Sequence, residues 1–266
     1  RTAAGQRLLA DWLLAPAAPD EVLARQTAVR ELRDDFDLRE RLWRAGGVFA
    51  REHATSTVSS WITAPGVVPS TSVRVSAFVL GLVGAGATVA LFTGRPLVTF
   101  LAALALVPFA RRHAALVAEV SRRVQHQTDE LEAVGRLIDV VADRRFASPR
   151  LESLRQSLAA EGRPARARIA ELGRRVAWFE SRRNPFFGIT TAPLLFGTQM
   201  AFAIEAWRVR HGRAVAGWLT ALAEIEALAS LATFAFDQPG TVFPDVLPDA
   251  EGPRLEADAL AHPLLA

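Results

Sequence analysis

The run VSAFVLGLVGAGATVALFTG, from Val75 to Gly94, decides the fold of this chain. It holds 20 residues without a formal charge, and about 20 apolar residues are what a helix needs to cross the hydrocarbon core of a bilayer. Arg95 and Pro96 interrupt the run, and a second uncharged run of 14 residues, LVTFLAALALVPFA, ends at Ala110. A helix of that length is only about 21 Å long, so a full span requires the two arginines that follow it to reach the headgroups with extended side chains. Residues 73–110 are therefore predicted to form an apolar helical hairpin that crosses a membrane.

A hairpin buried in a large soluble core is the alternative, although an uncharged run of this length is long for a soluble helix. Glycines weaken a helix in water, but in lipid small residues allow helices to approach closely. Ala77, Gly81 and Ala85 are spaced four residues apart and are predicted to form such a packing ridge. Gly84-Ala85-Gly86 does not indicate a nucleotide loop, because neither a third glycine nor Gly-Lys-Ser/Thr follows at the required spacing.

Composition narrows the class of protein. The 266 residues have a net charge of only +3, which gives no overall signature of polyanion binding. All 31 basic residues are arginine, a bias that we attribute to GC-rich codons. Cysteine is absent, which excludes disulfides and thiolate metal sites. The chain starts at Arg1 without the features of a signal peptide, and we expect it to be an internal fragment of a longer protein.

Outside the hairpin the pattern is almost wholly helical. Helices are predicted over residues 1–15, over a segment capped by Asp20, from Leu38, over 117–143, from Pro149, over 169–179 and over 217–236. Residues 34–37 are predicted to be a polar turn and 65–69 a linker. The third apolar stretch, 185–206, is predicted to be one buried helix, with a third membrane helix as the alternative. The fold class is therefore all-α, a bundle of long helices interrupted by the hairpin.

The helices divide into four predicted parts. Residues 1–72 are the first part of a helical core, and 73–110 are the hairpin. Residues 111–247 hold lever helices and the second part of the core. Residues 248–266 are expected to begin a further domain, with a strand starting near Leu255 that the chain does not complete.

No catalytic or metal-binding constellation follows from the side chains. The five histidines lack the HExxH spacing or a second ligand nearby, and the serines lack a G-x-S-x-G elbow. A basic segment at 163–183 could contact phosphates of DNA or of anionic lipids, and a plain solvated helix face is the alternative. Its candidate contact residues are Arg163, Arg166, Arg168, Arg174 and Arg175. Paired arginines at 111–112 and 122–123 suit the cytoplasmic side of a membrane, whereas Arg95 in the turn argues weakly against that orientation.

Three stretches resemble the MutS family of DNA mismatch-repair ATPases. Thr2 to Leu32, TAAGQRLLADWLLAPAAPDEVLARQTAVREL, is similar to a family pattern of Thr, Gly, Arg-Leu-Leu, Trp-Leu, Pro, Arg-Gln and Val-x-Glu-Leu. Leu222 to Phe236, LAEIEALASLATFAF, is similar to the lever helix that leads into the ATPase domain. His262-Pro263 is similar to the dipeptide that opens that domain. The resemblance covers most of the chain outside 67–115.

The resemblance implies a core and lever region from a MutS-like subgroup that carries membrane segments. It implies a parent ATPase that binds ATP and Mg in a domain beyond Ala266, engages double-stranded DNA and forms a homodimer through that domain. This chain departs from the family because it lacks the mismatch-reading domain with its Phe-x-Glu motif and the connector domain. We expect no catalytic residues and no cofactor within the chain itself, and a bacterial inner-membrane location with the soluble parts facing the cytoplasm. A helical membrane scaffold without DNA binding is the alternative function, and a soluble protein with a buried hairpin is a third possibility.

Overall fold

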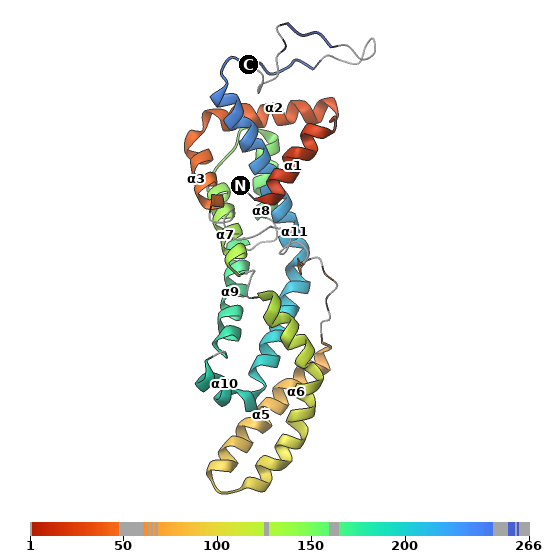
Figure 1. Cartoon of the computed structure of the whole chain (residues 1–266), viewed down its shortest axis with the longest axis vertical. Helices are drawn as coiled ribbons and strands as arrows, with labels where there is room; N and C mark the ends of the chain where they lie inside the picture. The colour runs from red at the N-terminus through yellow and green to blue at the C-terminus, as the bar shows by residue number, and fades with distance from the viewer. Residues whose placement is uncertain are drawn as a thin grey trace.

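The computed structural model describes residues 2–47, 61–62, 64, 66, 69–124, 128–159, 165–182, 184–246, 255–258 and 260. These residues form helices and no strand, so the predicted all-α class is confirmed for the part of the chain that is described. The molecule is elongated, with the hairpin at one end and the N-terminal helices near the other (Figure 1). The predicted linker at 65–69 and the predicted domain start at 248–266 lie largely outside the described residues.

Two helices open the chain as predicted. Helix α1 (Ala3–Leu14) is capped by Thr2, whose hydroxyl accepts a hydrogen bond from the Gly5 amide. Helix α2 (Pro19–Asp34) begins one residue before the predicted cap. Asp20 is therefore not the N-cap but lies in the first turn, because proline, with its fixed φ and no amide hydrogen, takes the first helical position.

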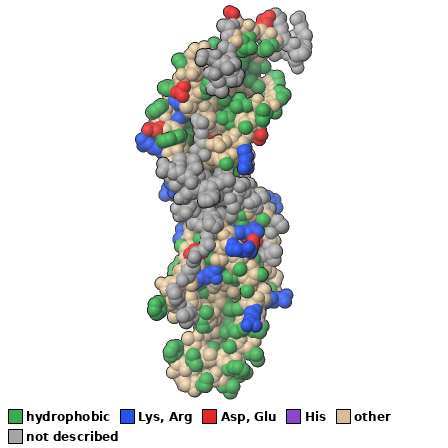
Figure 2. All heavy atoms as spheres, in the orientation of Figure 1, with side chains coloured by type: hydrophobic (Ala, Val, Ile, Leu, Met, Phe, Trp, Pro, Cys, Tyr) green, Lys and Arg blue, Asp and Glu red, His purple; other side chains and the backbone are tan. Residues whose placement is uncertain are grey.

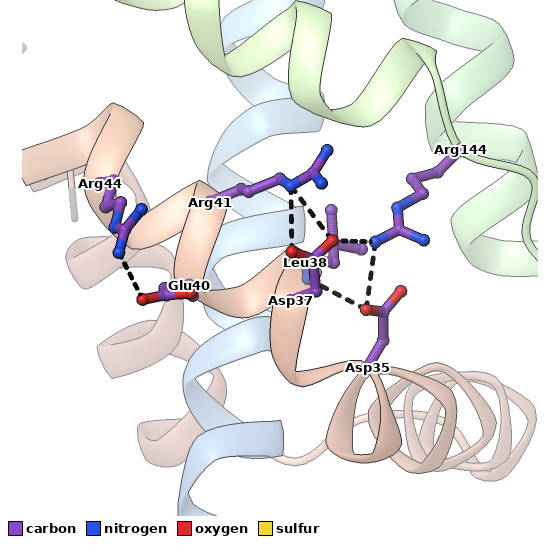
Figure 3. Close-up of polar contacts among 7 residues, drawn as sticks. All are labelled: Asp35, Asp37, Leu38, Glu40, Arg41, Arg44 and Arg144. Carbon is purple, nitrogen blue, oxygen red and sulfur yellow. Dashed lines mark hydrogen bonds and ion pairs between the residues drawn. The ribbon is translucent and has the colours of Figure 1, made fainter.

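The predicted turn at 34–37 is shorter in the structure, since α2 continues to Asp34 and α3 (Phe36–Gly47) begins at Phe36. Asp35 makes this possible, because its carboxylate accepts a hydrogen bond of 3.0 Å from the Leu38 amide at the start of α3. Arg144 reaches the same junction and pairs with Asp37 at 2.6 Å and with Asp35 at 3.4 Å (Figure 3). The junction of α2 and α3 is thereby tied to the segment after α7.

The apolar hairpin consists of α5 (Thr71–Phe92) and α6 (Pro96–Val124). Gly94 has φ +78°, which the tight turn between them requires and which glycine adopts without a steric penalty. The second arm is not a 14-residue helix, because α6 runs on without a break past the predicted boundary at 110. The predicted helix over 117–143 is in turn divided between the end of α6 and α7 (Thr128–Ala142).

Three further helices pack apolar stripes into the core. These are α7, α8 (Pro149–Ala159) and α9 (Ala165–Ser181). The predicted helix over 169–179 lies within α9, and its apolar residues are buried in one cluster with those of α7 and α8. The buried stripe residues are Val134, Ile138, Val141, Leu151, Leu154, Leu158, Ile169, Leu172, Val176 and Phe179.

The third apolar stretch is not one buried helix. It divides into α10 (Pro185–Thr191), the short 3-10 helix η2 (Ala192–Leu194) and the start of α11 (Phe196–Asp237). Leu195 breaks the chain direction with φ 51°, the one non-glycine residue with positive φ in the described chain. Helix α11 includes the separate helix predicted over 217–236 and runs for 42 residues along the length of the molecule (Figure 1).

Candidate membrane segment and basic segment

The hairpin exposes its large apolar side chains instead of burying them. Leu104, in the first half of α6, is 67% exposed, and only 6% of the most apolar stretch of α6 is buried within the protein. In Figure 2 the end of the molecule that holds the hairpin shows green apolar side chains and no acidic ones. The described residues of this chain therefore do not enclose the hairpin in a core. The exposed residues are Val75, Phe78, Val79, Leu82, Val83, Val89, Leu91, Phe92, Leu97, Val98, Phe100, Leu101, Leu104 and Val107.

Helices α5, α6 and α11 are each long and apolar enough to cross a membrane, which indicates that the protein is membrane-associated. At about 1.5 Å per residue α5 is about 33 Å long, enough for a bilayer core of about 30 Å. Helix α11 differs from the hairpin, since 56% of its most apolar stretch is buried inside the protein. The hairpin therefore keeps one face against the protein and leaves its large apolar side chains exposed among the described residues.

The inner face of α5 is made of small residues that admit a close backbone contact. A Cβ atom on Gly84 would lie 1.9 Å from the Pro193 carbonyl oxygen, and one on Gly81 would lie 2.7 Å from the Leu194 carbonyl oxygen. The predicted ridge residues differ in their burial. Ala77 and Gly81 are buried, but Ala85 is only half-buried and Gly84 takes its place. The partner of the ridge is η2, which the sequence did not predict.

Gln199 stabilises this contact. Its amide nitrogen donates to the Leu194 carbonyl oxygen at 2.8 Å and lies 3.5 Å from the Ala77 carbonyl oxygen. An irregular backbone at membrane depth is tolerated only where protein groups satisfy its carbonyls. This role of Gln199 depends on the break at Leu195, so no local signal in the sequence indicates it.

Charged side chains mark both ends of the hairpin. Arg74, Arg111 and Arg112 are exposed at the end where the hairpin joins the bundle, and Arg95 is exposed at the tip. Next to them His113 stacks on Phe109 with ring centroids 4.5 Å apart and meets Phe202 of α11 edge-on at 5.2 Å. This stacking connects α6 to α11 at the boundary of the apolar segment.

Aromatic rings gather at the elbow between α9 and α11. Trp178, Phe187 and Phe196 form a triangle with centroid separations of 6.4, 6.3 and 5.6 Å. Phe186 beside them is 84% exposed. Tryptophan, here Trp178, is enriched where a protein meets the headgroup region of a membrane.

The predicted basic segment does not form one open phosphate-binding face. Arg163 lies outside the described residues. Arg168 is buried and engaged within the protein, so it does not present its guanidinium at the surface. Arg175 donates to the Ala203 carbonyl oxygen at 2.9 Å and to Glu171 at 2.6 Å. Arg174 is exposed, which leaves it available for contacts with a partner.

Arg166, the remaining candidate, pairs with Asp139 of α7 at 3.1 Å. Burial raises the pKa of the Asp139 carboxyl, the nearby Arg166 charge acts in the opposite direction, and Asp143 adds to the rise. Arg166 therefore connects α9 to α7, and its side chain is 72% exposed. The predicted phosphate contacts thus divide between structural and exposed arginines.

Two of the buried carboxylates on α11, Glu205 and Glu226, have hydrogen-bond partners among the described residues. Arg208 pairs with Glu205 at 2.6 Å, with side chains only 3% and 7% exposed. Arg208 also donates to the Trp61 and Ala64 carbonyl oxygens, at 2.8 and 2.6 Å. At the other end of α11, Glu226 accepts hydrogen bonds from the amide and the hydroxyl of Thr2. These contacts fasten both halves of the long helix to segments that are distant in sequence.

Within the described residues no group of three or more His, Asp or Glu side chains could hold a metal ion. His53, His126 and His262 lie outside that part of the chain. The arrangement offers an apolar surface, charged borders and a long helix.

Comparison with known proteins gives no match, whether with a family model, a curated protein or a solved structure. The resemblance to the MutS family therefore stays a prediction from the sequence.

Proposed function

We propose that this chain is a membrane-anchored lever, in which the hairpin inserts into the bilayer and α11 transmits motion to the far end of the molecule. The observation that carries the proposal is the continuity of α11. Its 42 residues extend about 63 Å. The helix contacts α5 and α6 near its start and α1 and α2 near its end.

The positive-inside rule supports a bacterial inner-membrane location with the bundle on the cytoplasmic side. Three arginines, Arg74, Arg111 and Arg112, flank the bundle end of the hairpin, against Arg95 alone at the tip. Arginine near the end of a membrane helix favours the cytoplasmic side.

The MutS-like assignment extends this proposal to the parent protein. The parent is an ATPase that binds ATP and Mg in a further domain, dimerises through it and engages double-stranded DNA, while this chain alone is not an enzyme. The packing supports it, because two of the resembling stretches, distant in sequence, are neighbours. Thr2 at the start of α1 contacts Glu226 in the lever-like stretch, and Gly5 leaves room for that carboxylate.

A scaffold without DNA binding is the second candidate, and the state of the basic segment favours it. Arg168 is buried, and Arg175 is engaged within the protein. A DNA-binding surface needs several arginines free for phosphates, since each contact contributes to the affinity and to its salt dependence.

Duplex binding by the full-length protein at increasing salt separates the two candidates. If the chain is the lever of a DNA-binding ATPase, we expect binding at about 50 mM salt that weakens steeply toward about 200 mM. Absence of binding at low salt refutes DNA engagement and leaves the scaffold. ATP hydrolysis by this chain alone, above the background of a mock preparation, would contradict the assignment of the ATPase activity to a further domain.

A further inference from the structure

The third apolar stretch approaches and leaves the hairpin from the same side. Helix α9 leads from the bundle to α10, and α11 returns to the bundle beside α5 and α6 (Figure 1). Arg175 of α9 donates to the Ala203 carbonyl oxygen of α11 at 2.9 Å, so the two arms pass each other at one level. Phe202 at that level meets His113, which directly follows the paired arginines at the bundle end of the hairpin. Both arms therefore pass the border where the hairpin joins the bundle.

Between the two arms the chain reaches about half the length of the hairpin. The short helix η2 lies against Gly84 of α5, where an added Cβ would be 1.9 Å from the Pro193 carbonyl oxygen. From Arg74 to Gly84, α5 advances about 15 Å. The hydrocarbon core of a bilayer is about 30 Å thick. With the exposed Arg74 at the border of this core, η2 lies near its middle.

The segment that reaches this depth has a composition suited to lipid. Residues 184–204 contain no acidic or basic side chain. The Thr190 hydroxyl donates to the Phe186 carbonyl oxygen at 2.9 Å. The Asn184 side chain accepts a hydrogen bond of 3.0 Å from the Phe186 amide at the start of α10. Such internal partners are what a break in a helix needs at membrane depth, because no water is present there to satisfy polar groups.

The charged side chains next to the segment have partners within the protein. Glu180 and Arg182 at the end of α9 are half-buried and engaged within the protein. The Arg182 guanidinium stacks on Phe179 at 3.9 Å, one turn nearer the bundle, and a long arginine side chain can carry its charge toward the membrane surface in this way. After the segment, Glu205 pairs with the buried Arg208.

Apolar side chains are exposed on the outer side of the segment. Phe186 of α10 is 84% exposed, and Trp178, where α9 leads into the segment, is 58% exposed. Ala192 of η2 is exposed as well. Since η2 packs on α5, this surface is continuous with the exposed apolar surface of the hairpin.

We propose that residues 184–204 form a re-entrant membrane segment, which enters the bilayer from the bundle side, reaches about its middle beside Gly84 and returns without crossing. Acyl chains of the leaflet on the bundle side cover Phe186 and Ala192, and Trp178 lies nearer the headgroups. Helix α11 is long and apolar enough to cross. Its far part packs on α1 and α2, which precede the hairpin, so a crossing would separate helices that are in contact. This inference rests on the proposed insertion of the hairpin.

The depth of the segment is measured on the full chain in phosphatidylcholine vesicles. Single cysteines carry a fluorophore, since the chain has no cysteine of its own. We expect a label on Ala192→Cys to be quenched most strongly by lipids with a nitroxide near the middle of the acyl chain. Iodide in the water should quench it several-fold less than a label on Ala167→Cys, an exposed alanine of α9 in the bundle. Equal quenching by iodide at the two alanines overturns the proposal.

The sidedness of the chain separates re-entry from a crossing by α11. A membrane-impermeant maleimide is added to right-side-out and to inverted vesicles from cells that express the full chain. We expect Ala167→Cys and Thr220→Cys, which precede and follow the segment, to react in the same type of vesicle. Reaction in opposite types overturns the proposal, because it would mean that α11 crosses. Circular dichroism verifies that the variants fold, and every substituted side chain is exposed.

Thr93→Cys, at the tip of the hairpin, reports on the proposed insertion separately. We expect it to react in the type of vesicle in which Ala167→Cys does not. If it does so while iodide quenches labels on Ala192→Cys and Ala167→Cys equally, re-entry alone is refuted. If Thr93→Cys reacts together with Ala167→Cys, the hairpin does not cross, and the proposed function fails together with this inference.

Discussion

Replacing Gly84 with alanine tests the contact that holds the hairpin against the rest of the protein. The added methyl carbon would lie 1.9 Å from the Pro193 carbonyl oxygen and 2.7 Å from its carbonyl carbon. Both are backbone atoms, which cannot rotate away as a side chain does. To reach an ordinary contact of 3.4 Å, α5 and η2 must separate by about 1.5 Å. Overpacking of this kind costs about 1–3 kcal/mol.

Gly86 provides the matched control, because a Cβ there meets nothing within 4 Å. Both positions are in the interior of α5, so the gain in helix propensity from alanine, up to about 1 kcal/mol, cancels in the comparison. The difference between Gly84→Ala and Gly86→Ala therefore isolates the contact with η2.

The assay is thermal unfolding of the detergent-solubilised chain, followed by intrinsic tryptophan fluorescence. For a protein of this size 1 kcal/mol shifts Tm by about 2–4 °C, so we expect Gly84→Ala to unfold about 2–12 °C below Gly86→Ala. Equal Tm values for the two variants would refute the reasoning, because they would mean that η2 does not lie against Gly84.

Three further predictions concern the bundle. Arg208→Ala leaves the buried Glu205 carboxylate without its partner and lowers the free energy of unfolding by about 3–5 kcal/mol. Arg44→Ala removes an exposed pair and changes the free energy of unfolding by less than about 1 kcal/mol; similar losses of Tm in the two variants would contradict the burial of the Arg208–Glu205 pair. Gly217→Ala meets no atom within 4 Å on α11 and raises stability by up to about 1 kcal/mol; a fall in Tm would show that this part of the lever is not a regular helix. Hydrogen bonds from Arg155, the largest cause, hold the pKa of Glu152 at about 2, below its usual 4.5. The ionised Glu152 therefore stabilises the fold fully above about pH 4.5, and this contribution is lost as the pH falls toward 2. We expect Glu152→Gln to reduce the dependence of Tm on pH between these values and to leave the dependence above about pH 5 unchanged.

Features that depend on composition could be predicted from the sequence. The hairpin follows from two uncharged runs and a charged turn, and the stripe from Ile169 to Phe179 follows from helical periodicity. Exposure of the hairpin also agrees with its content of glycine and the absence of charged residues from its two runs. These signals are local, so no knowledge of tertiary contacts is needed to read them.

Features that depend on tertiary contacts could not be predicted. The break at Leu195 places a leucine at positive φ, which no local signal favours. The contact of Gly84 with η2 depends on that break, and Gln199 acquires its role only there. Continuity was also missed, because Arg111 and Arg112 suggested the end of an apolar helix, while arginine is a good helix former and α6 continues through both.

The central claim is that the hairpin lies in lipid, and a spin-label accessibility scan tests it most directly. The chain has no cysteine, so single cysteines can be introduced at Leu82, Leu97 and Leu104, which are exposed on the hairpin. Ala115 on α6 beyond the hairpin serves as the control position. After reconstitution in vesicles, the account predicts that labels at Leu82 and Leu104 are accessible to oxygen and shielded from a water-soluble nickel complex. Accessibility to the nickel complex at Leu82 and Leu104 equal to that at Ala115 would contradict it.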